Sequence, residues 1–498
     1  MESVSQRWMD SYIEKSSELI KDTNPLPNET DKGVEINHAF CDSMVKWVWE
    51  EVIPFRYSHK FRNALAAHRR RHMAVSTGNP EVDQKYIIWS LSGGLGNRVQ
   101  ALTSVLMSAL LSERVLLLKD WFTPLRSSKS PPVRPILLPF AKNVNETEVF
   151  RYEDLRELFW FSNGESTPRA PNEFMFCSLF PMMSLSEFER IYPDEFRNHN
   201  YSHDIVPFKN GHAKIDIRAG HDKNLKLWKH FACGDPLIGR GIDFFSRQRF
   251  VYVWTNQYFL PIFYVNKRTS SVVKSWIKKD PFRSMLPLVF LPARPVMYRV
   301  LRRMRSSPRI QNRKYVGLHI RSFKQQDESR LIASFSICVR QFLDKVTFPN
   351  MFFLATMSQE AKNHFSILQS TSKSRFVVQE TKGKNEKQST GQGVVQEWEA
   401  VTDVVLLSLS RHIFLSPTST FGFLAAAAGE IEAITVVSDR YVSGGLGDRT
   451  CMMLNGNVVT EPCFTSWFRL DSIGSRRHHI GCEMDFLPSW SLECGTRK

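Results

Sequence analysis

The stretch YIIWSLSGGLGNRVQALTSVLMSALLSERVLLLKDW (residues 86–121) indicates the fold class of this 498-residue chain. It begins with an apolar run, residues 86–91, that suits a buried strand, and a glycine-rich loop follows. Apolar residues then recur at helical spacing from Val99 to Leu110, and a second apolar run, Arg114 to Leu118, suits another strand. This order of strand, glycine loop, helix and strand predicts the start of an α/β domain with a parallel sheet.

The same alternation returns in the C-terminal half of the chain. The pattern predicts strands at residues 314–320, 351–356, 375–378, 412–415 and 433–437, and helices at residues 331–346, 359–369, 397–410 and 420–428. Two doubly wound domains in one chain usually hold a ligand in the cleft between them. We therefore predict a stem over residues 1–80, an N-terminal Rossmann-like domain over 81–308, a C-terminal one over 309–450 and a cysteine-rich tail over 451–498.

The composition indicates a globular chain that favours anionic partners. Hydrophobic residues make up 42% of the chain, which is ample for a core, and 66 Lys plus Arg against 50 Asp plus Glu give a net charge of +16. Such a field favours nucleotides, nucleic acid or a membrane surface. The basic runs at residues 68–72 and 299–303 are most economically solvated helix faces. We therefore expect no nucleic-acid partner.

Neither a membrane span nor a signal peptide is expected from the sequence. The most apolar segment, Val99 to Leu118, is interrupted by Glu113 and Arg114, and residues 1–40 lack the order of a signal peptide. An oxidising compartment is nevertheless favoured by three sequons and by a cysteine cluster in the tail. The sequons begin at Asn28, Asn145 and Asn200, and the cysteines are Cys451, Cys463, Cys482 and Cys494. Four cysteines in a short, turn-rich tail predict disulfides, with three possible connectivities.

The glycine loop that starts at Gly93 allows three interpretations. Gly94 and Gly96, with Asp120 after the next strand, resemble a dinucleotide fingerprint. Val99 replaces its third glycine, however, and Arg98 would bring a positive charge into the loop. A tight turn without a ligand is the second interpretation, because glycines there often serve only a positive φ. In the third, the backbone approaches a nucleotide sugar closely and Asn97 hydrogen-bonds to sugar hydroxyls.

The strand VGLHIRSF (residues 316–323) carries one candidate group for binding a diphosphate. Strand alternation places His319 and Arg321 on one face at the carboxyl end of the strand, where side chains point toward a ligand crevice. The planar fork of an arginine matches phosphate oxygens, and the alternative is a structural salt bridge.

The stretch SPTSTFGFLAAAAG (residues 416–429) carries a second candidate. Ser419 or Thr420 can cap the helix that follows, whose free N–H groups and dipole form a natural phosphate seat. Gly422 would allow a ligand to approach closely. Capping alone would also explain the hydroxyls.

Six motifs, in order over residues 86–465, resemble those of the plant-type xyloglucan fucosyltransferases, glycosyltransferase family 37. They are Gly94-Leu-Gly-Asn-Arg98, Asn256-Gln-Tyr-Phe-Leu-Pro261, Gly317-Leu-His-Ile-Arg321, Glu397-Trp-Glu with Asp403, Ser419-Thr-Phe-Gly-Phe423 and Glu461-Pro-Cys-Phe464. The resemblance implies a GT-B fold, with two facing Rossmann-like domains and a cleft between them. It also implies an inverting enzyme that moves L-fucose from GDP-fucose to a galactose-type residue of a cell-wall or glycoprotein glycan, through an α-1,2 linkage and without a metal ion or other cofactor.

The resemblance also suggests roles for individual residues. It implies that Arg321 binds the donor diphosphate and offsets the charge growing on GDP, and that Asn97 acts with it in the catalytic site. The N-terminal domain would take the acceptor and the C-terminal domain the donor. The donor-binding residues would be Arg321, His319, Ser419, Thr420, Phe421 and Gly422, with Glu397 and Asp403 as nucleotide contacts or helix-packing groups, and the cleft residues would be Gly94, Gly96, Asn97 and Arg98.

The chain departs from the family in two respects. His319 stands where the family commonly has Gln. Family members usually carry an N-terminal anchor in the Golgi membrane, so a Golgi location here would require a partner or a missing anchor. Two other functions are weighed against the transferase: a catalytically silent GT-B protein that binds glycan or nucleotide, and a basic nucleic-acid-binding protein. The intact Arg321 and the Ser419–Gly422 turn speak against the silent protein.

Overall fold

A computed structural model divides the chain into two compact units. It describes residues 7–21, 31–79, 84–91, 94–119, 176–177, 179–180, 183–184, 188, 192, 212–217, 249–255, 258–265, 269–278, 280–313, 315–321, 328–344, 351–371, 375–378, 393–416, 419–431, 433–436 and 451–453. Unit 1 comprises Met1–Leu26, Arg294–Cys463 and Glu493–Lys498, and unit 2 comprises Pro27–Ala293 and Phe464–Leu492. The predicted stem, residues 1–80, is therefore shared between both units, and the units divide at Arg294 rather than at residue 309.

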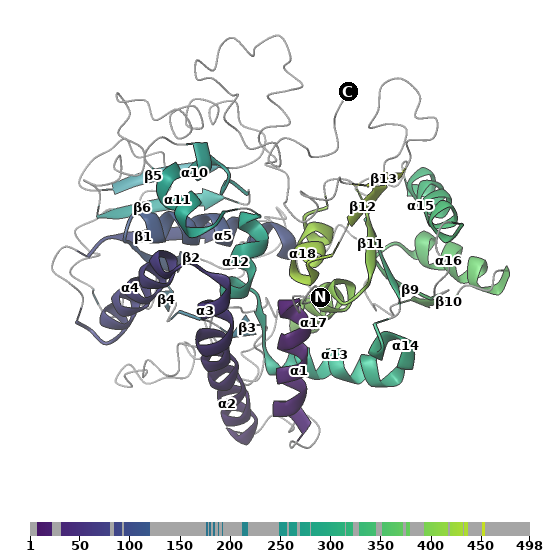
Figure 1. Cartoon of the computed structure of the whole chain (residues 1–498), viewed down its shortest axis with the longest axis horizontal. Coiled ribbons are helices and arrows are strands. Elements are labelled where there is room, and N and C mark those ends of the chain that lie inside the picture. The colour runs from purple at the N-terminus through teal and green to yellow at the C-terminus, as the bar shows by residue number, and fades with distance from the viewer. Residues whose placement is uncertain are drawn as a thin grey trace, which may run out of the picture. The chain divides into compact units, whose positions relative to one another are not determined.

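Unit 2 is built on a parallel sheet. Among the described residues the strand order is β4-β2-β1-β6-β5 (Figure 1). The strands are β1 (Tyr86–Leu91), β2 (Val115–Lys119), β4 (Met183–Ser184), β5 (His212–Ile217) and β6 (Phe250–Thr255), and every pair of neighbours is parallel. Helix α5 (Leu95–Leu111) connects β1 to β2, so the predicted strand, glycine loop, helix and strand are present.

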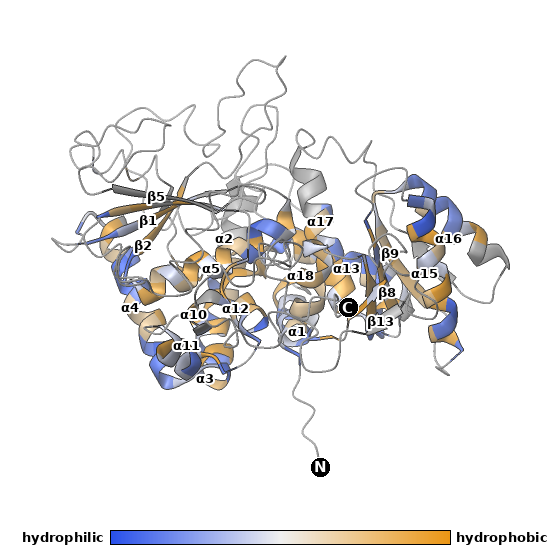
Figure 2. Cartoon of the chain, turned by 90° about the horizontal axis from the view of Figure 1, so that it is seen from above, coloured by the Kyte–Doolittle hydropathy of each residue, from blue (hydrophilic) through white to orange (hydrophobic). Residues whose placement is uncertain are grey.

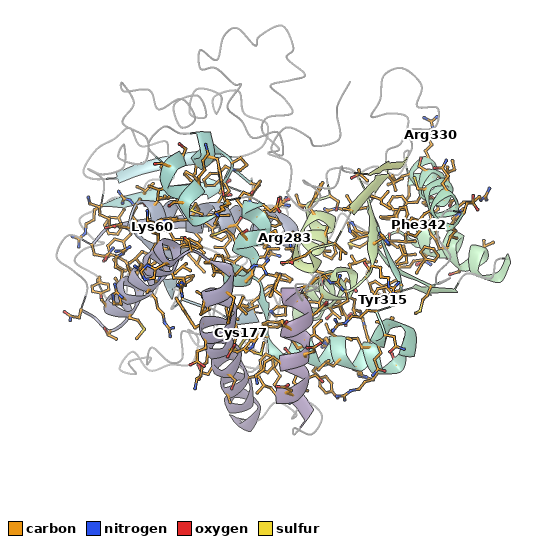
Figure 3. The ribbon with its side chains drawn as sticks, in the orientation of Figure 1. Lys60, Cys177, Arg283, Tyr315, Arg330 and Phe342 are labelled. Carbon is orange, nitrogen blue, oxygen red and sulfur yellow. A yellow bond between two sulfur atoms is a disulfide. The ribbon has the colours of Figure 1, made fainter. Side chains whose placement is uncertain are left out.

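The described residues of unit 2 also form helices and a short two-stranded sheet. They are α2 (Asp31–Trp47), a π-helical turn (Val48–Val52), α3 (Ile53–Arg56), α4 (His59–Ser76), α10 (Ile262–Val265), α11 (Ser270–Trp276), α12 (Pro281–Val289), β3 (Phe176–Cys177) and β7 (Leu291–Pro292). A disulfide joins Cys41 of α2 to Cys177 of β3, which is labelled in Figure 3. The disulfide links parts of the chain that are 136 residues apart, so it fixes α2 covalently to β3 within unit 2. Of the tail cysteines predicted to form disulfides, Cys463, Cys482 and Cys494 lie outside the described residues.

The basic run at residues 68–72 lies on α4, and only part of it is a solvated face. Arg70 is exposed, but His68 and His72 are buried, with their Nε2 atoms 3.1 Å apart. Arg69 lies over the ring of Trp49, 5.2 Å from its centroid. The prediction of a solvated helix face is therefore wrong for His68 and His72, because both lie on the buried side of α4.

Unit 1 is built on a second sheet in the order β10-β9-β8-β11-β12-β13 among the described residues. The strands are β8 (Val316–Ile320), β9 (Met351–Thr356), β10 (Arg375–Val378), β11 (His412–Leu415), β12 (Ala433–Val436) and β13 (Cys451–Met453). All neighbouring strands are parallel except β12 and β13. The predicted bounds of β9, β10 and β11 agree with the structure, and those of β8 and β12 differ by one or two residues.

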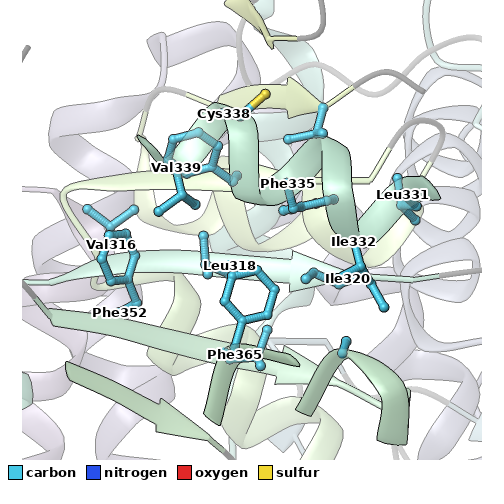
Figure 4. Packing of buried hydrophobic residues seen from close by; sticks show 14 of the residues in the cluster. Val316, Leu318, Ile320, Leu331, Ile332, Phe335, Cys338, Val339, Phe352 and Phe365 are labelled. Atoms are coloured by element: carbon cyan, nitrogen blue, oxygen red, sulfur yellow. The ribbon is translucent and has the colours of Figure 1, made fainter. Parts of the chain in front are cut away.

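Helices cover both faces of this sheet (Figure 1). They are α13 (Arg294–Ser306), α14 (Pro308–Gln311), α15 (Glu328–Leu343), α16 (Gln359–Thr371), α17 (Gly393–Ser408) and α18 (Thr420–Gly429). On one face, Val316 and Leu318 of β8 point toward Phe335 and Val339 of α15 (Figure 4). On the other face, Tyr315, labelled in Figure 3, donates its hydroxyl to the carbonyl of Leu406 in α17. Strands buried on both faces explain the nearly continuous apolar runs in the sequence.

The N-terminal helix α1 (Trp8–Lys21) is an integral part of unit 1 rather than part of a stem. It packs against α13 and α18. The Arg7 Nη1 atom donates to the carbonyls of Ser410 and Gly429, at 3.2 and 3.3 Å, just beyond α17 and at the end of α18. Arg313 pairs with Asp10 of α1 at 2.9 Å. A guanidinium at two helix C-termini satisfies carbonyls that have no partner within their helices.

Helix α18 of unit 1 is both hydrophobic and buried. Figure 2 shows α18 as largely hydrophobic, and all its residues from Gly422 to Gly429 are buried. Within the described residues, no helix combines the length and the apolar character that crossing a bilayer requires.

We predict that Arg7→Ala lowers the free energy of unfolding of the protein by about 1–3 kcal/mol, because two buried carbonyls lose a charged donor. Thermal and denaturant melts would measure the change. Lys15→Ala is the matched control, since it removes only the exposed pair with Glu18 on the same helix and should change stability by less than about 0.5 kcal/mol. Equal losses for the two variants would contradict this role of Arg7.

Candidate functional site

The candidate site lies at the carboxyl edge of the unit 1 sheet. Of the strands in this sheet β8 comes first in the chain, with β9 and β10 on one side of it and β11 and β12 on the other. The strand order therefore reverses between β8 and β11. In open α/β sheets ligands bind beyond the carboxyl ends of the strands at such a switch point. The last residues of β8 and β11, and the start of α18, lie at this position in the topology.

Hydroxyl groups on both neighbouring strands hold the backbone at the end of β8. The amide of Arg321 donates to Ser416 Oγ at 2.8 Å, and the amide of Ser416 donates to the His319 carbonyl at 3.1 Å. From the other side, Thr356 Oγ1 donates to the Ile320 carbonyl at 2.8 Å. These hydrogen bonds fix the backbone of Arg321 at the carboxyl edge of the sheet, where a ligand is expected to bind.

Ser416 and Thr356 were not assigned to the site from the sequence. Each is a buried hydroxyl residue directly after or at the end of an apolar strand. That placement is the signal that could have identified them, since a buried hydroxyl at a strand end must find a backbone partner.

His319 is buried beside Arg321 and has well-defined neighbours. Its ring stacks on Phe421, with centroids 4.8 Å apart and an interplanar angle of 21°. Its Nδ1 atom lies 3.2 Å from Ser419 Oγ. Burial, and secondarily the positive charge of Arg321, lowers the pKa of His319 to about 3. The imidazole is therefore neutral at physiological pH, and the guanidinium of Arg321 supplies the fixed positive charge here.

Ser419 is the N-cap of α18, as one of the two sequence alternatives predicted. Its Oγ atom accepts from the Gly422 amide at 3.2 Å. Thr420 is the first residue of the helix, half-buried, and Phe421 follows it. Ser419 thus connects the helix start to His319, so the first turn of α18 lies next to the end of β8.

Gly422 lies in a close contact within the protein that the sequence did not predict. A Cβ atom at this position would lie 2.9 Å from Leu415 Cβ and 3.3 Å from His319 Nδ1. The absence of a side chain therefore allows α18 to approach β11 and the imidazole. This contact within the protein explains the glycine without close approach of a ligand.

Asp403 and Glu397 lie on α17. Asp403 pairs with Arg303 of α13 at 3.2 Å, and Glu399 pairs with the same guanidinium. Of the two interpretations left open for Asp403, the ion pair favours helix packing over a nucleotide contact. It also shows that Arg303 joins two helices instead of forming part of a solvated flank. Glu397 is placed on α17, but its side chain lies outside the described residues.

The glycine-loop residues belong to unit 2. Gly94 is the N-cap of α5 with φ −74°, and Gly96, Asn97 and Arg98 lie in its first turn, which begins at Leu95. A Cβ at Gly94 would meet no atom within 4 Å, so neither a positive φ nor a close internal contact requires this glycine. Asn97 is half-buried and Arg98 is buried. Gly93 and Asp120 lie outside the described residues.

The structure thus brings five of the predicted donor-site residues together at one edge of unit 1. They are His319, Arg321, Ser419, Phe421 and Gly422. In the part of the chain that is described, no cluster of three or more His, Cys, Asp or Glu residues is suited to hold a metal ion.

We predict opposite behaviour for two glycine substitutions. Gly422→Ala forces a Cβ against Leu415 and His319 and should destabilise the protein by about 1–3 kcal/mol. Gly94→Ala places its Cβ in open space and should lose at most about 1 kcal/mol, from weaker N-capping. Thermal melts of both variants test this, and an unchanged melting temperature for Gly422→Ala would refute the internal role of that glycine.

We also predict that His319 makes the protein less stable in acid. Its folded-state pKa lies below the unfolded value of about 6.5, so below pH 6.5 the unfolded chain takes up a proton that the folded chain excludes. Stability therefore falls as the pH drops from 6.5 toward 3. His319→Gln removes this contribution, and its melting temperature should decline less between pH 6.5 and 4. Part of the decline should remain, since burial also lowers the pKa of His68. Parallel declines in the variant and the wild type would exclude the effect.

Comparisons with known proteins agree with these observations. No family model matches the chain. Over 368 residues, 72% of the chain, the sequence is 23% identical to a protein named probable fucosyltransferase 9 from Arabidopsis thaliana. The match spans 63% of that relative, which is less than two thirds of its length.

The fold is similar to that of a solved FUT1 mutant from Arabidopsis thaliana in complex with GDP. The TM-score is 0.54 at 16% sequence identity, and the match covers 85% of this chain and 88% of that one. The fold is therefore of the GT-B type, as the motifs implied. The chain thus resembles a plant fucosyltransferase in its sequence and another in its fold, as the six motifs indicated.

Proposed function

We propose that this chain is an inverting fucosyltransferase that moves L-fucose from GDP-fucose to a galactose-type residue of a cell-wall or glycoprotein glycan, with an α-1,2 linkage. The observation that carries the proposal is the position of Arg321 at the switch point of unit 1, beside a neutral His319 and the start of α18. The fucosyltransferase named in the sequence comparison and the GDP complex found in the fold comparison support the donor chemistry.

The positive groups at this edge suit the leaving group of the reaction. Cleavage of the bond between fucose C1 and the phosphate oxygen leaves that electron pair on GDP, so negative charge grows on the diphosphate. The Arg321 guanidinium can accept this charge through paired N–H···O bonds, and the first-turn amides of α18 add the positive end of a helix dipole. Donors fixed before the reaction lower the barrier because they need no reorganisation.

The acceptor is assigned to unit 2 in this proposal. Gly94 leaves open space at the start of α5, and the side-chain amide of Asn97, in the first turn of the helix, can hydrogen-bond to sugar hydroxyls. Arg98 would support this edge from its buried position. Unit 1 takes the donor, and the residues named above at its carboxyl edge bind the diphosphate.

The reaction requires no metal ion in this proposal, because Arg321 and the helix start neutralise the diphosphate. We place the enzyme in the Golgi, in keeping with the family and with the Cys41–Cys177 disulfide, which suits an oxidising compartment. Membrane association would come through a partner or an anchor.

The proposal is tested by incubating the purified protein with labelled GDP-fucose and a panel of galactose-ended oligosaccharides. We expect acceptor-dependent release of GDP that a metal chelator does not reduce. Arg321→Ala should lower kcat about a hundredfold, since the loss of one such donor typically costs about 3 kcal/mol. Arg340→Ala, an exposed arginine on α15, is the matched control and should retain full activity.

GDP binding without turnover on any acceptor would instead indicate a silent binding protein. Turnover by Arg321→Ala equal to that of the control variant would refute the assignment of the diphosphate to this edge.

A further inference from the structure

The hydroxyl of Ser104 makes a buried contact that the proposed mechanism has not used. Ser104 lies on α5, and its Oγ atom accepts from the amides of Phe259 and Leu260 at 3.0 and 3.1 Å. It also approaches the Gln100 carbonyl at 3.3 Å, to which it donates. Ser104 and Leu260 have no exposed surface and Phe259 is 2% exposed. A serine hydroxyl has one hydrogen and two lone pairs, so the hydrogen-bonding capacity of Ser104 is filled.

The two amides belong to the segment that connects β6 to α10. Strand β6 lies next to β1 in the unit 2 sheet, and residues 258–261 follow its carboxyl end in the chain. The Trp89 Nε1 atom donates to the Thr255 carbonyl at 3.4 Å and joins the ends of these two strands. In unit 2 the strand order reverses between β1 and β6, since β1 comes first in the chain and has β2 on its other side. The segment after β6 therefore starts at the switch point of unit 2.

Ser104 links this segment to α5, the helix that starts at the same edge of the unit 2 sheet. Helix α5 starts at the carboxyl end of β1 with Gly94 and Asn97, and Ser104 lies two turns further along it. The amides of Phe259 and Leu260 lie beyond the end of β6 at Thr255, outside its hydrogen-bonded ladder, and a buried backbone amide must be satisfied by another group. The serine supplies both bonds from one atom, which fixes the distance between α5 and the backbone that follows β6.

We propose that Ser104 is a positioning residue of the acceptor site: it holds the segment after β6 against α5 so that this segment and the first turn of α5 form one rigid edge. The inference rests on the proposed function, in which this edge takes the glycan acceptor. Without the hydroxyl two buried amides lose their acceptor, and the segment moves away from α5 to find water.

The first test measures the contact itself and does not depend on activity. Ser104→Ala should raise the rate of amide hydrogen exchange in peptides covering residues 258–265 by at least about tenfold, because unsatisfied buried amides favour local opening. Ser108→Ala is the matched control: its hydroxyl lies one turn further along α5 and donates only to the Ser104 carbonyl, at 2.9 Å. Equal exchange in the two variants would overturn the proposal.

The second test measures the consequence for the acceptor. With a galactose-terminated xyloglucan oligosaccharide as substrate, Ser104→Ala should raise the acceptor KM about tenfold while the GDP Kd from calorimetry stays unchanged. Ser104→Thr keeps the hydroxyl and should restore most of the lost affinity, and Ser108→Ala should match the wild type. Melting curves identify any variant that fails to fold.

Two results would overturn the acceptor role of Ser104. One is an unchanged acceptor KM in Ser104→Ala despite faster exchange, and the other is an equal loss of GDP affinity. If the wild type shows no turnover while the exchange difference is present, the proposed function has failed and the acceptor role fails with it, although the contact of Ser104 stands.

Discussion

The hydrogen bonds that join the ends of β8 and β11 through Ser416 are the constraint on which the candidate site depends. Ser416 accepts from the Arg321 amide and donates to the His319 carbonyl, so it fixes the backbone on both sides of Ile320. A single hydrogen bond contributes only about 1 kcal/mol net, but a buried group that loses its partner is destabilised by more than that. The positions of the strand ends are therefore held more firmly than the net energy of a single hydrogen bond suggests. The guanidinium of Arg321 starts from this anchored point.

Burial decides which groups carry charge at this edge. The imidazole of His319 is enclosed by Phe421 and Ser419 and remains neutral, because the low-dielectric surroundings and the neighbouring Arg321 disfavour a second cation. A neutral ring can stack on Phe421 and hydrogen-bond to the helix cap without repelling the arginine. Gly422 makes this packing possible, because any side chain there would collide with β11. Positive potential thus comes from one guanidinium and the start of α18, and both suit an anionic diphosphate.

Sequence patterns predicted the elements of this site better than the contacts between them. The strands that end at Leu415 and Thr356, and a helix cap at Ser419 or Thr420, followed from apolar runs and from capping chemistry. A glycine in the first turn of an alanine-rich helix fits both ligand approach and internal packing, and the contact of Gly422 with β11 could not be predicted from the sequence. The docking of Arg7 and the disulfide of Cys41 join residues far apart in the chain, and local periodicity carries no information about such contacts.

The central claim is that the edge around Arg321 and the start of α18 binds the diphosphate of the donor. A crystal structure of the protein with GDP tests it most directly. The account predicts phosphate oxygens within about 3 Å of the Arg321 guanidinium and of first-turn amides of α18, with the His319 ring still stacked on Phe421. A diphosphate bound at another edge, with Arg321 directed away from it, would contradict the account.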